Sequence, residues 1–229
     1  MNELLEKGLA LFPEYFRDLI ALTTGPKRFV AARLPEKRVF EKAFIFLGMS
    51  YGFGFILKAS LFQQNLWLAL ATGAAFTLVQ AVSYGTAIWL AWRAVGGIGT
   101  LTGTIVITLY YTAIVDFISG FMVVGMLGAV RLGDPALYEE MLAATGNGTI
   151  AQLATQTERL AASAGVRLGL LILLVLTIVF AIWIVAGWGA YRLQHRLTPA
   201  RSIPAFLLFI VFCVPVSAML FIVATALTR

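Results

Sequence analysis

The sequence has few charged residues, since only 12% of its 229 residues are Asp, Glu, Lys or Arg. Soluble domains carry about 25%, so this composition excludes a protein whose surface mainly faces water. Hydrophobic residues make up 60% of the chain. They occur in separate long runs with charged residues between them, rather than at the scattered positions of one soluble core. The sequence therefore indicates a single integral membrane protein.

Residues used in catalysis and metal binding are also scarce. The chain has one cysteine, Cys213, and one histidine, His195. A single cysteine excludes an intrachain disulfide and a cysteine-based zinc site, and we expect His195, in a basic connection, to be exposed at the membrane interface. The glycine-rich segment Gly96–Thr100 lacks the Gly-Lys-Ser/Thr of a nucleotide-binding loop, and we interpret it as a flexible turn. No paired acids or nucleophile–base spacing appears, so the sequence predicts no enzyme, cofactor or metal site.

Five apolar runs are long enough to cross a bilayer, because a helix needs ~20 such residues to span the hydrocarbon. The sequence therefore predicts an all-α polytopic membrane protein with five transmembrane helices. The predicted spans are about Ala43–Phe62, Leu66–Trp92, Thr104–Leu127, Leu168–Ala190 and Ile203–Leu227.

The distribution of basic residues predicts the orientation of these spans. Twelve of the 17 Lys and Arg residues lie before the first span and in the connections at 93–103 and 191–202. Cytoplasmic segments carry such an excess, so we expect a cytoplasmic amino terminus and an extracytoplasmic carboxyl terminus. Most of the net charge of +6 flanks the spans, where topology and anionic lipid account for it. We therefore expect membrane lipids, and no nucleic acid, as partners.

Residues 1–25 form an amphipathic arm before the membrane domain at 26–229. On a helical wheel its leucines and aromatic residues, including Phe12 and Phe16, lie opposite its charged residues, as in a helix at the membrane interface. Pro13 is expected to kink or divide this helix. Docking on the protein's own cytoplasmic face and direct lipid contact are both consistent with the pattern. The lipid-interface residues that we predict are Phe12, Phe16, Lys27, Arg28, Arg33, Lys37 and Arg38.

The connection at about 128–167 is predicted to form an extracytoplasmic helical hairpin. Asp134-Pro135 is typical of an N-cap followed by a first-turn proline, which would open a helix over Ala136–Ala144. Gly146-Asn147-Gly148 indicates a turn, and Thr149 is expected to cap a second helix that ends near Ser163.

Three polar residues within the spans could form one buried cluster. Lys58, Gln80 and Asp116 fall at similar predicted depths on the first three spans, and charge at membrane depth normally faces protein or a water-filled cavity. The cluster could bond helices together, Lys58 could instead extend to the outer surface, or the three could line a transport path. Gly48 and Gly52 have the spacing that permits close helix packing, within the chain or between copies.

Three segments resemble the Yip (Ypt/Rab-interacting protein) domain family in its bacterial form. They are Pro26-Lys27-Arg28-Phe29, Gly96-Gly97-Ile98-Gly99-Thr100 and His195-Arg-Leu-Thr198-Pro-Ala-Arg201. Five spans and a cytoplasmic amino terminus are similar too, whereas Asp116 and the enlarged outer hairpin depart from the pattern. The resemblance implies a non-enzymatic protein of the bacterial inner membrane that works through partner or lipid contacts.

The sequence thus favours an integral membrane scaffold or accessory subunit. Such a protein would act as a homo-oligomer or as a subunit of a membrane complex. The alternative hypothesis is a small transporter or channel that uses the polar residues around Asp116.

Overall fold

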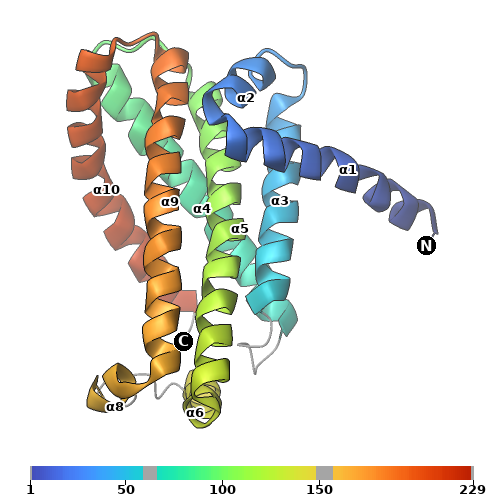
Figure 1. The fold of residues 1–229 in the computed structure, drawn as a ribbon. Helices are drawn as coiled ribbons and strands as arrows, with labels where there is room; N and C mark the ends of the chain where they lie inside the picture. The colour runs from blue at the N-terminus through green and yellow to red at the C-terminus, as the bar shows by residue number, and fades with distance from the viewer. Residues whose placement is uncertain (1, 59–65, 148–156, 228–229) are drawn as a thin grey trace. The chain divides into compact units, whose positions relative to one another are not determined.

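The computed structural model describes the backbone of residues 2–58, 66–147 and 157–227, and the side chains of 11–58, 66–143 and 160–222. The described backbone forms nine α-helices and contains no strand, which confirms the predicted all-α class (Figure 1). The helices are α1 (Asn2–Thr24), α2 (Pro26–Arg33), α3 (Val39–Lys58), α4 (Leu66–Ala94), α5 (Leu101–Gly133), α6 (Pro135–Asn147), α8 (Thr157–Ala162), α9 (Ala164–His195) and α10 (Pro199–Leu227).

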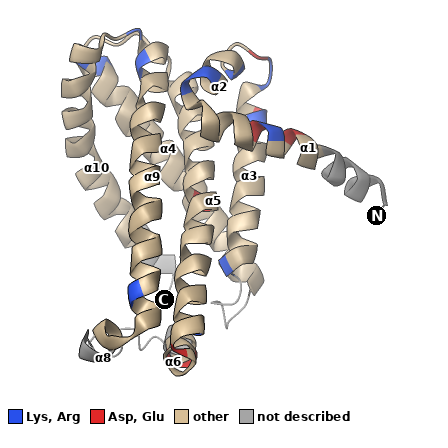
Figure 2. Ribbon diagram, in the orientation of Figure 1, with Lys and Arg blue, Asp and Glu red and all other residues tan. Residues whose placement is uncertain are grey.

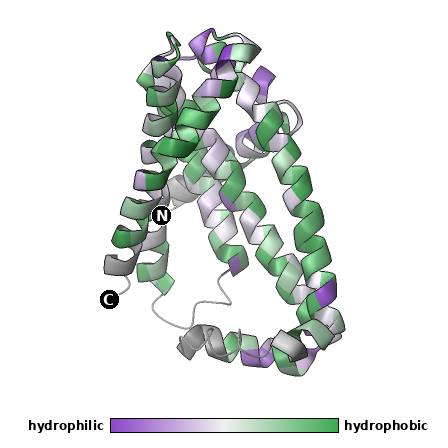
Figure 3. Ribbon diagram, turned by 90° about the vertical axis from the view of Figure 1, so that its left-hand side faces the viewer, coloured by the Kyte–Doolittle hydropathy of each residue, from purple (hydrophilic) through white to green (hydrophobic). Residues whose placement is uncertain are grey.

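Five of these helices are long and apolar enough to cross a membrane, namely α3, α4, α5, α9 and α10. Hydrophobic residues cover them along most of their length (Figure 3). Each begins or ends within a few residues of a predicted span. The first predicted span, Ala43–Phe62, ends in residues outside the described part of the chain. Length and hydropathy were therefore sufficient to locate the spanning helices, since both properties follow from the bilayer thickness.

The chain forms two compact units. Unit 1 comprises Met1–Met49, Ala74–Ile114 and Trp183–Arg229, and unit 2 comprises Ser50–Gly73 and Val115–Ile182. The amino-terminal arm, which we predicted as a separate segment, belongs to unit 1 together with α2 and the first half of α3.

An aromatic cluster forms the core of unit 1 where α1, α2, α3 and α5 meet. Tyr15 of α1 packs on Phe46 of α3, with ring centroids 5.1 Å apart. Phe46 packs in turn on Tyr110 of α5 at 5.3 Å, and Phe29 of α2 meets Tyr110 edge-on at 5.0 Å. All four side chains are buried. Because aromatic pairs contribute about 0.5–1.5 kcal/mol beyond their buried area, this cluster holds the first two helices on the spanning ones.

A second aromatic group joins α4, α9 and α10 within the same unit. Trp92 is fully buried and lies 5.0 Å from Trp188 between ring centroids. Trp188 also meets Phe206 of α10 edge-on at 5.1 Å. The hydroxyl of Tyr191 lies 3.0 Å from that of Thr108, so a buried hydrogen bond joins α9 to α5.

Within unit 2, helices α3 and α5 approach each other closely at Gly54 and Gly120, whereas the predicted glycines make no such contact. A Cβ atom added to Gly54 would lie 2.8 Å from the carbonyl oxygen of Asp116, and one added to Gly120 would lie 3.1 Å from the Cα of Gly54. At Gly48 and Gly52 such an atom would meet no described atom within 4 Å. The small residues that bring α3 and α5 together are therefore Gly54 and Gly120.

The connection after α5 begins as predicted. Asp134 accepts a hydrogen bond from the backbone N–H of Leu137 through its Oδ1 at 3.1 Å, which is the bond of a helix N-cap. The helix that it caps, α6, extends to Asn147, three residues beyond the predicted end. The predicted cap Thr149 lies outside the described residues, and α8 ends at Ala162, close to the predicted end near Ser163.

The contact at Gly54 predicts a specific effect of added volume. Gly54→Ala should lower the thermal stability of the purified protein in detergent, because the new methyl group would meet backbone, and overpacking costs about 1–3 kcal/mol. Gly52→Ala is the matched control on the same helix, and it should leave stability unchanged or raise it slightly, since alanine favours helix. Equal effects of the two substitutions would contradict the packing described at Gly54.

Candidate functional site

A network of ion pairs joins the arm to the segment that leads into the first spanning helix. Arg33, the last residue of α2, donates hydrogen bonds to Asp18 of α1 and, at 2.9 Å, to Glu36 of the following connection. Glu36 also accepts from the ammonium of Lys42 on α3 at 2.8 Å. The side chain of Arg33 is only 12% exposed and that of Asp18 only 10%. The network therefore links three helices from a largely buried position.

The pKa values within the network reflect these contacts. Burial alone would lower the pKa of Arg33, but the hydrogen bonds to Asp18 and Glu36 outweigh it, and the net effect raises that pKa. The pKa of Glu36 is lowered, first by the hydrogen bond from Lys42 and then by that from Arg33. A carboxylate with a lowered pKa stabilises the folded state above its usual titration range and loses that contribution as pH falls through the folded pKa. The contribution of Glu36 to the stability of the folded state is therefore fully present at neutral pH.

The predicted role of Arg33 at the lipid interface is wrong. The sequence pattern grouped it with its basic neighbours, but its guanidinium is turned inward and lies 5.6 Å from the ring centroid of Phe29. By contrast, the other basic residues predicted for this interface are exposed, namely Lys27, Arg28, Lys37 and Arg38. The side chain of Arg38 is 81% exposed. In unit 1 the basic residues gather at the end that carries α2 and the short interhelical connections (Figure 2).

Helix α1 has one face against unit 1 and another at the surface. Tyr15, Leu19 and Leu22 are buried, and the backbone carbonyl of Leu22 accepts a hydrogen bond from the indole of Trp183 at 3.4 Å. The predicted interface residues Phe12 and Phe16 are exposed, together with Ile20. Pro13 lies within the helix and does not divide it. The arm is thus docked on the protein and still presents an apolar stripe to its surroundings.

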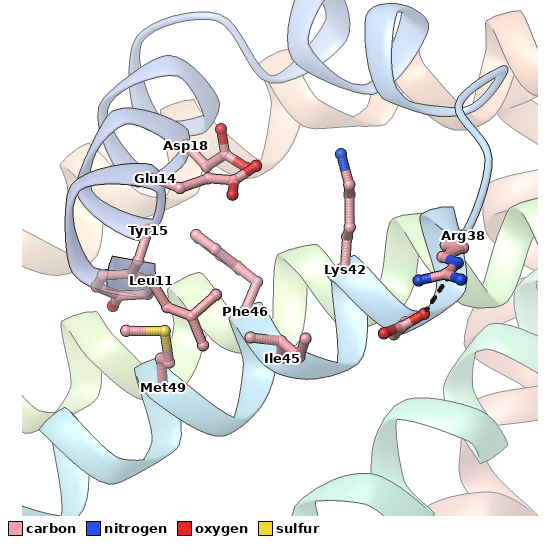
Figure 4. Close-up of a pocket in the computed structure, with 10 residues that line it drawn as sticks. Leu11, Glu14, Tyr15, Asp18, Arg38, Lys42, Ile45, Phe46 and Met49 are labelled. Carbon is pink, nitrogen blue, oxygen red and sulfur yellow. Dashed lines mark ion pairs between the residues drawn. The ribbon is translucent and has the colours of Figure 1, made fainter. Parts of the chain in front are cut away.

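A groove of about 220 Å³ lies between α1 and α3. Its charged lining comes from Glu14 and Asp18 on α1 and from Arg38, Glu41 and Lys42 at the start of α3. The remaining lining is apolar or aromatic, from Leu11, Tyr15, Ile45, Phe46 and Met49. Figure 4 shows the carboxylates of Glu14 and Asp18 and the ammonium of Lys42 directed into the space between the two helices, with Met49 and Leu11 below them. The lining of the groove therefore combines charged and apolar side chains.

His195 is fully buried, so the exposed position expected for it is wrong. It lies between the two short connections at the basic end of unit 1, stacks on Trp92, and accepts a backbone hydrogen bond from Ile98. Its Nε2 lies 2.9 Å from the hydroxyl of Thr104, which also contacts the carbonyl of Thr100 at 2.9 Å. Because that hydroxyl donates to the carbonyl, it can accept from an Nε2–H group of His195, and in the neutral tautomer that donates there Nδ1 carries no proton.

The glycines of the first connection are in close contact with His195 rather than flexible. A Cβ atom added to Gly99 would lie 2.8–2.9 Å from three atoms of the imidazole ring, and one added to Gly97 would lie 2.9 Å from Nδ1. Only residues without a side chain allow the ring to approach this closely. Two of the segments that carried the family resemblance, Gly96–Thr100 and His195–Arg201, therefore contact each other directly.

The predicted intramembrane residues are distributed over both units. Lys58 and Asp116 belong to unit 2, and their charges interact, although no ion pair joins them among the described residues. Gln80 belongs to unit 1 and is partly buried. The Oδ2 atom of Asp116 is buried and has no hydrogen-bond partner in the described part of the chain. The backbone carbonyl of Asp116 accepts a hydrogen bond from Ser119 at 2.8 Å.

Sequence reasoning missed Asp18 and Glu36 as partners of Arg33, and it missed the groove. The spacing of Glu14 and Asp18 on one face of the arm was visible, but the sequence did not show which surface that face meets. No family model, curated protein or solved structure matches this chain.

Substitution of Arg33 should release the arm. Arg33→Ala leaves the buried carboxylate of Asp18 with only the longer contact to the exposed Arg17, at 3.8 Å, and breaking a buried pair costs on the order of 3 kcal/mol. We expect lower thermal stability in detergent and faster proteolysis within residues 11–25. Arg28→Ala, an exposed residue on the same helix, should change stability by less than about 0.5 kcal/mol. Equal protease sensitivity of the two variants would contradict the role assigned to Arg33.

Proposed function

We propose that this chain is a non-enzymatic membrane scaffold or accessory subunit that acts through protein and lipid contacts. The observation that carries the proposal is the apolar stripe of Phe12, Phe16 and Ile20 on a helix whose adjacent face is fixed to the protein. A helix held in this way presents its exposed residues in a defined direction. Apolar residues exposed together on one side commonly mark a site of membrane or partner contact.

The location that we propose is the bacterial inner membrane, with the amino terminus in the cytoplasm. The gathering of Lys and Arg at one end of unit 1 supports this orientation (Figure 2), because basic residues are retained on the cytoplasmic side of membranes. The resemblance to bacterial Yip-domain proteins leads to the same proposal for the class of function. In this arrangement α1 lies at the inner leaflet, where its stripe reaches lipid or an adjacent subunit.

Site-specific photocrosslinking from α1 tests the scaffold hypothesis. A photoreactive phenylalanine analogue at position 16 or 20 should give a discrete protein adduct in intact membranes, with either a second copy or a stoichiometric subunit. The same analogue at Tyr15, on the buried face, should crosslink only within the chain. Phe16→Glu should abolish co-purification of the protein that forms the adduct. A monodisperse monomer with lipid adducts alone would contradict a scaffold function.

A small transporter or channel is the second candidate, and Asp116 is the observation that favours it. Its buried Oδ2 atom has no described hydrogen-bond partner, and unpaired carboxylates within spanning helices commonly mark ion or proton pathways. Lys58, whose charge interacts with that of Asp116, would belong to the same path.

Flux measurements with an isosteric variant test this alternative. Asp116→Asn should abolish proton or potassium flux in liposomes while thermal stability changes by less than about 1 kcal/mol, because the shape of the side chain is kept and only its charge is lost. Ser119→Ala, one turn away on the same helix, is the control and should retain flux. Normal flux in Asp116→Asn would remove Asp116 from any transport path.

A further inference from the structure

The groove between α1 and α3 has the chemistry of a site for a phospholipid headgroup. We propose that it binds a zwitterionic phospholipid whose headgroup carries a primary ammonium next to the phosphate, as phosphatidylethanolamine does. The ammonium would meet Glu14, the phosphate would meet Lys42, and the start of one acyl chain would lie against Ile45 and Met49. This site requires α1 to lie at the membrane interface, as in the proposed function.

The order of residues along α3 matches the order of groups in such a lipid. Arg38, Glu41 and Lys42 line the groove where α3 begins, and Ile45, Phe46 and Met49 line it further along the helix. At ~1.5 Å per residue, Met49 lies about 10 Å beyond Lys42. A spanning helix that begins at the interface therefore presents its charged residues at headgroup depth and its apolar residues at acyl-chain depth.

The charges in the groove favour a zwitterion over an anionic lipid. Its lining contains three carboxylates, from Glu14, Asp18 and Glu41, and two cations, from Arg38 and Lys42. Arg33 and Arg17 lie against Asp18 and Glu14, and Arg38 pairs with Glu41, so the groove carries both signs of charge and has no net positive charge that would favour an anionic headgroup. A headgroup with both charges can satisfy the two sides of the groove at once, since Glu14 belongs to α1 and Lys42 to α3.

The groups assigned to the headgroup retain bonding capacity. Asp18 is held by Arg33, and Glu36, outside the groove, takes one hydrogen bond from Lys42. A Lys ammonium has three donors, so Lys42 can still donate to a phosphate oxygen. Glu14 lies 3.5 Å from Arg17 and 3.9 Å from Arg33, and its side chain is 45% exposed. Its carboxylate is therefore held less tightly than that of Asp18 and can accept from a primary ammonium.

The size of the groove fits part of a lipid. Its volume of about 220 Å³ is below the ~300–1,000 Å³ of sites that enclose a whole drug-sized ligand. It can thus hold the headgroup and the first methylenes of one chain. Leu11 and Ile45, which are both partly exposed, lie where the chain would leave the groove for the bilayer.

Thermal unfolding of the delipidated full-length protein in detergent tests the site. Phosphatidylethanolamine should raise Tm by about 2–4 °C more than phosphatidylcholine or phosphatidylglycerol with the same acyl chains. The choline headgroup has no N–H donor for Glu14, and the glycerol headgroup has no positive charge. Equal shifts with the three lipids, or the largest shift with phosphatidylglycerol, would overturn the proposal.

Two variants and one control assign the effect to the groove. Glu14→Gln keeps the shape and should reduce the shift with phosphatidylethanolamine to that with phosphatidylcholine. Met49→Trp should fill the apolar part and reduce the shifts with all three lipids. Glu139→Gln removes an exposed carboxylate on α6 and should change nothing. Retention of the lipid preference in Glu14→Gln, or its loss in Glu139→Gln, would overturn the assignment.

The lipid site and the scaffold function can fail separately. If the lipid preference is absent while position 16 still forms a protein adduct, the lipid site is disproved and the scaffold function stands. If the preference for phosphatidylethanolamine is present but no protein adduct forms, the scaffold function is disproved and the lipid site stands.

Discussion

The guanidinium of Arg33 donates to Asp18 on α1 and to Glu36 in the connection after α2, so one side chain holds three consecutive segments together. Arginine suits this position because its planar fork presents several donors at once, whereas lysine presents a single point charge. The carboxylate of Asp18 could not remain in its buried position without such a partner, since the cost of desolvating an unpaired charge is large. The path of the first 40 residues therefore depends on this contact.

The same contact fixes the rotation of α1 about its own axis. Asp18 follows Tyr15 by three residues and precedes Leu22 by four, so all three lie on one face of a helix with 3.6 residues per turn. The ion pair and the buried Tyr15 and Leu22 consequently face the same way. Phe16 is about 100° further round the helix, which turns it outward. The amphipathic arm can thus dock on the protein through one face and expose an apolar stripe on another.

Hydropathy and local capping rules predicted the five spanning helices and the cap at Asp134, because those features depend on residues that are adjacent in sequence. They could not predict the role of Arg33, which was grouped with the exposed Arg28 although the two differ only in what they meet in three dimensions. The same reason explains His195, whose burial depends on Gly97 and Gly99 nearly 100 residues earlier. Gly54 and Gly48 likewise look alike in the sequence. They differ in the fold because only Gly54 lies against the backbone of Asp116.

The groove follows from how α1 and α3 meet. Helix α1 lies across α3 (Figure 1), and Tyr15 and Phe46 make contact where the two approach. Helices that cross at an angle diverge on either side of the contact, so a wedge of space remains between them. Tyr15 and Phe46 form one side of that space, and Lys42 stands one turn nearer the start of α3. In a bilayer such a wedge cannot stay empty, and an amphiphile fills it best. Water would be in contact with the apolar side chain of Met49, and an acyl chain alone would leave the remaining donors of Lys42 and the exposed part of the Glu14 carboxylate unsolvated.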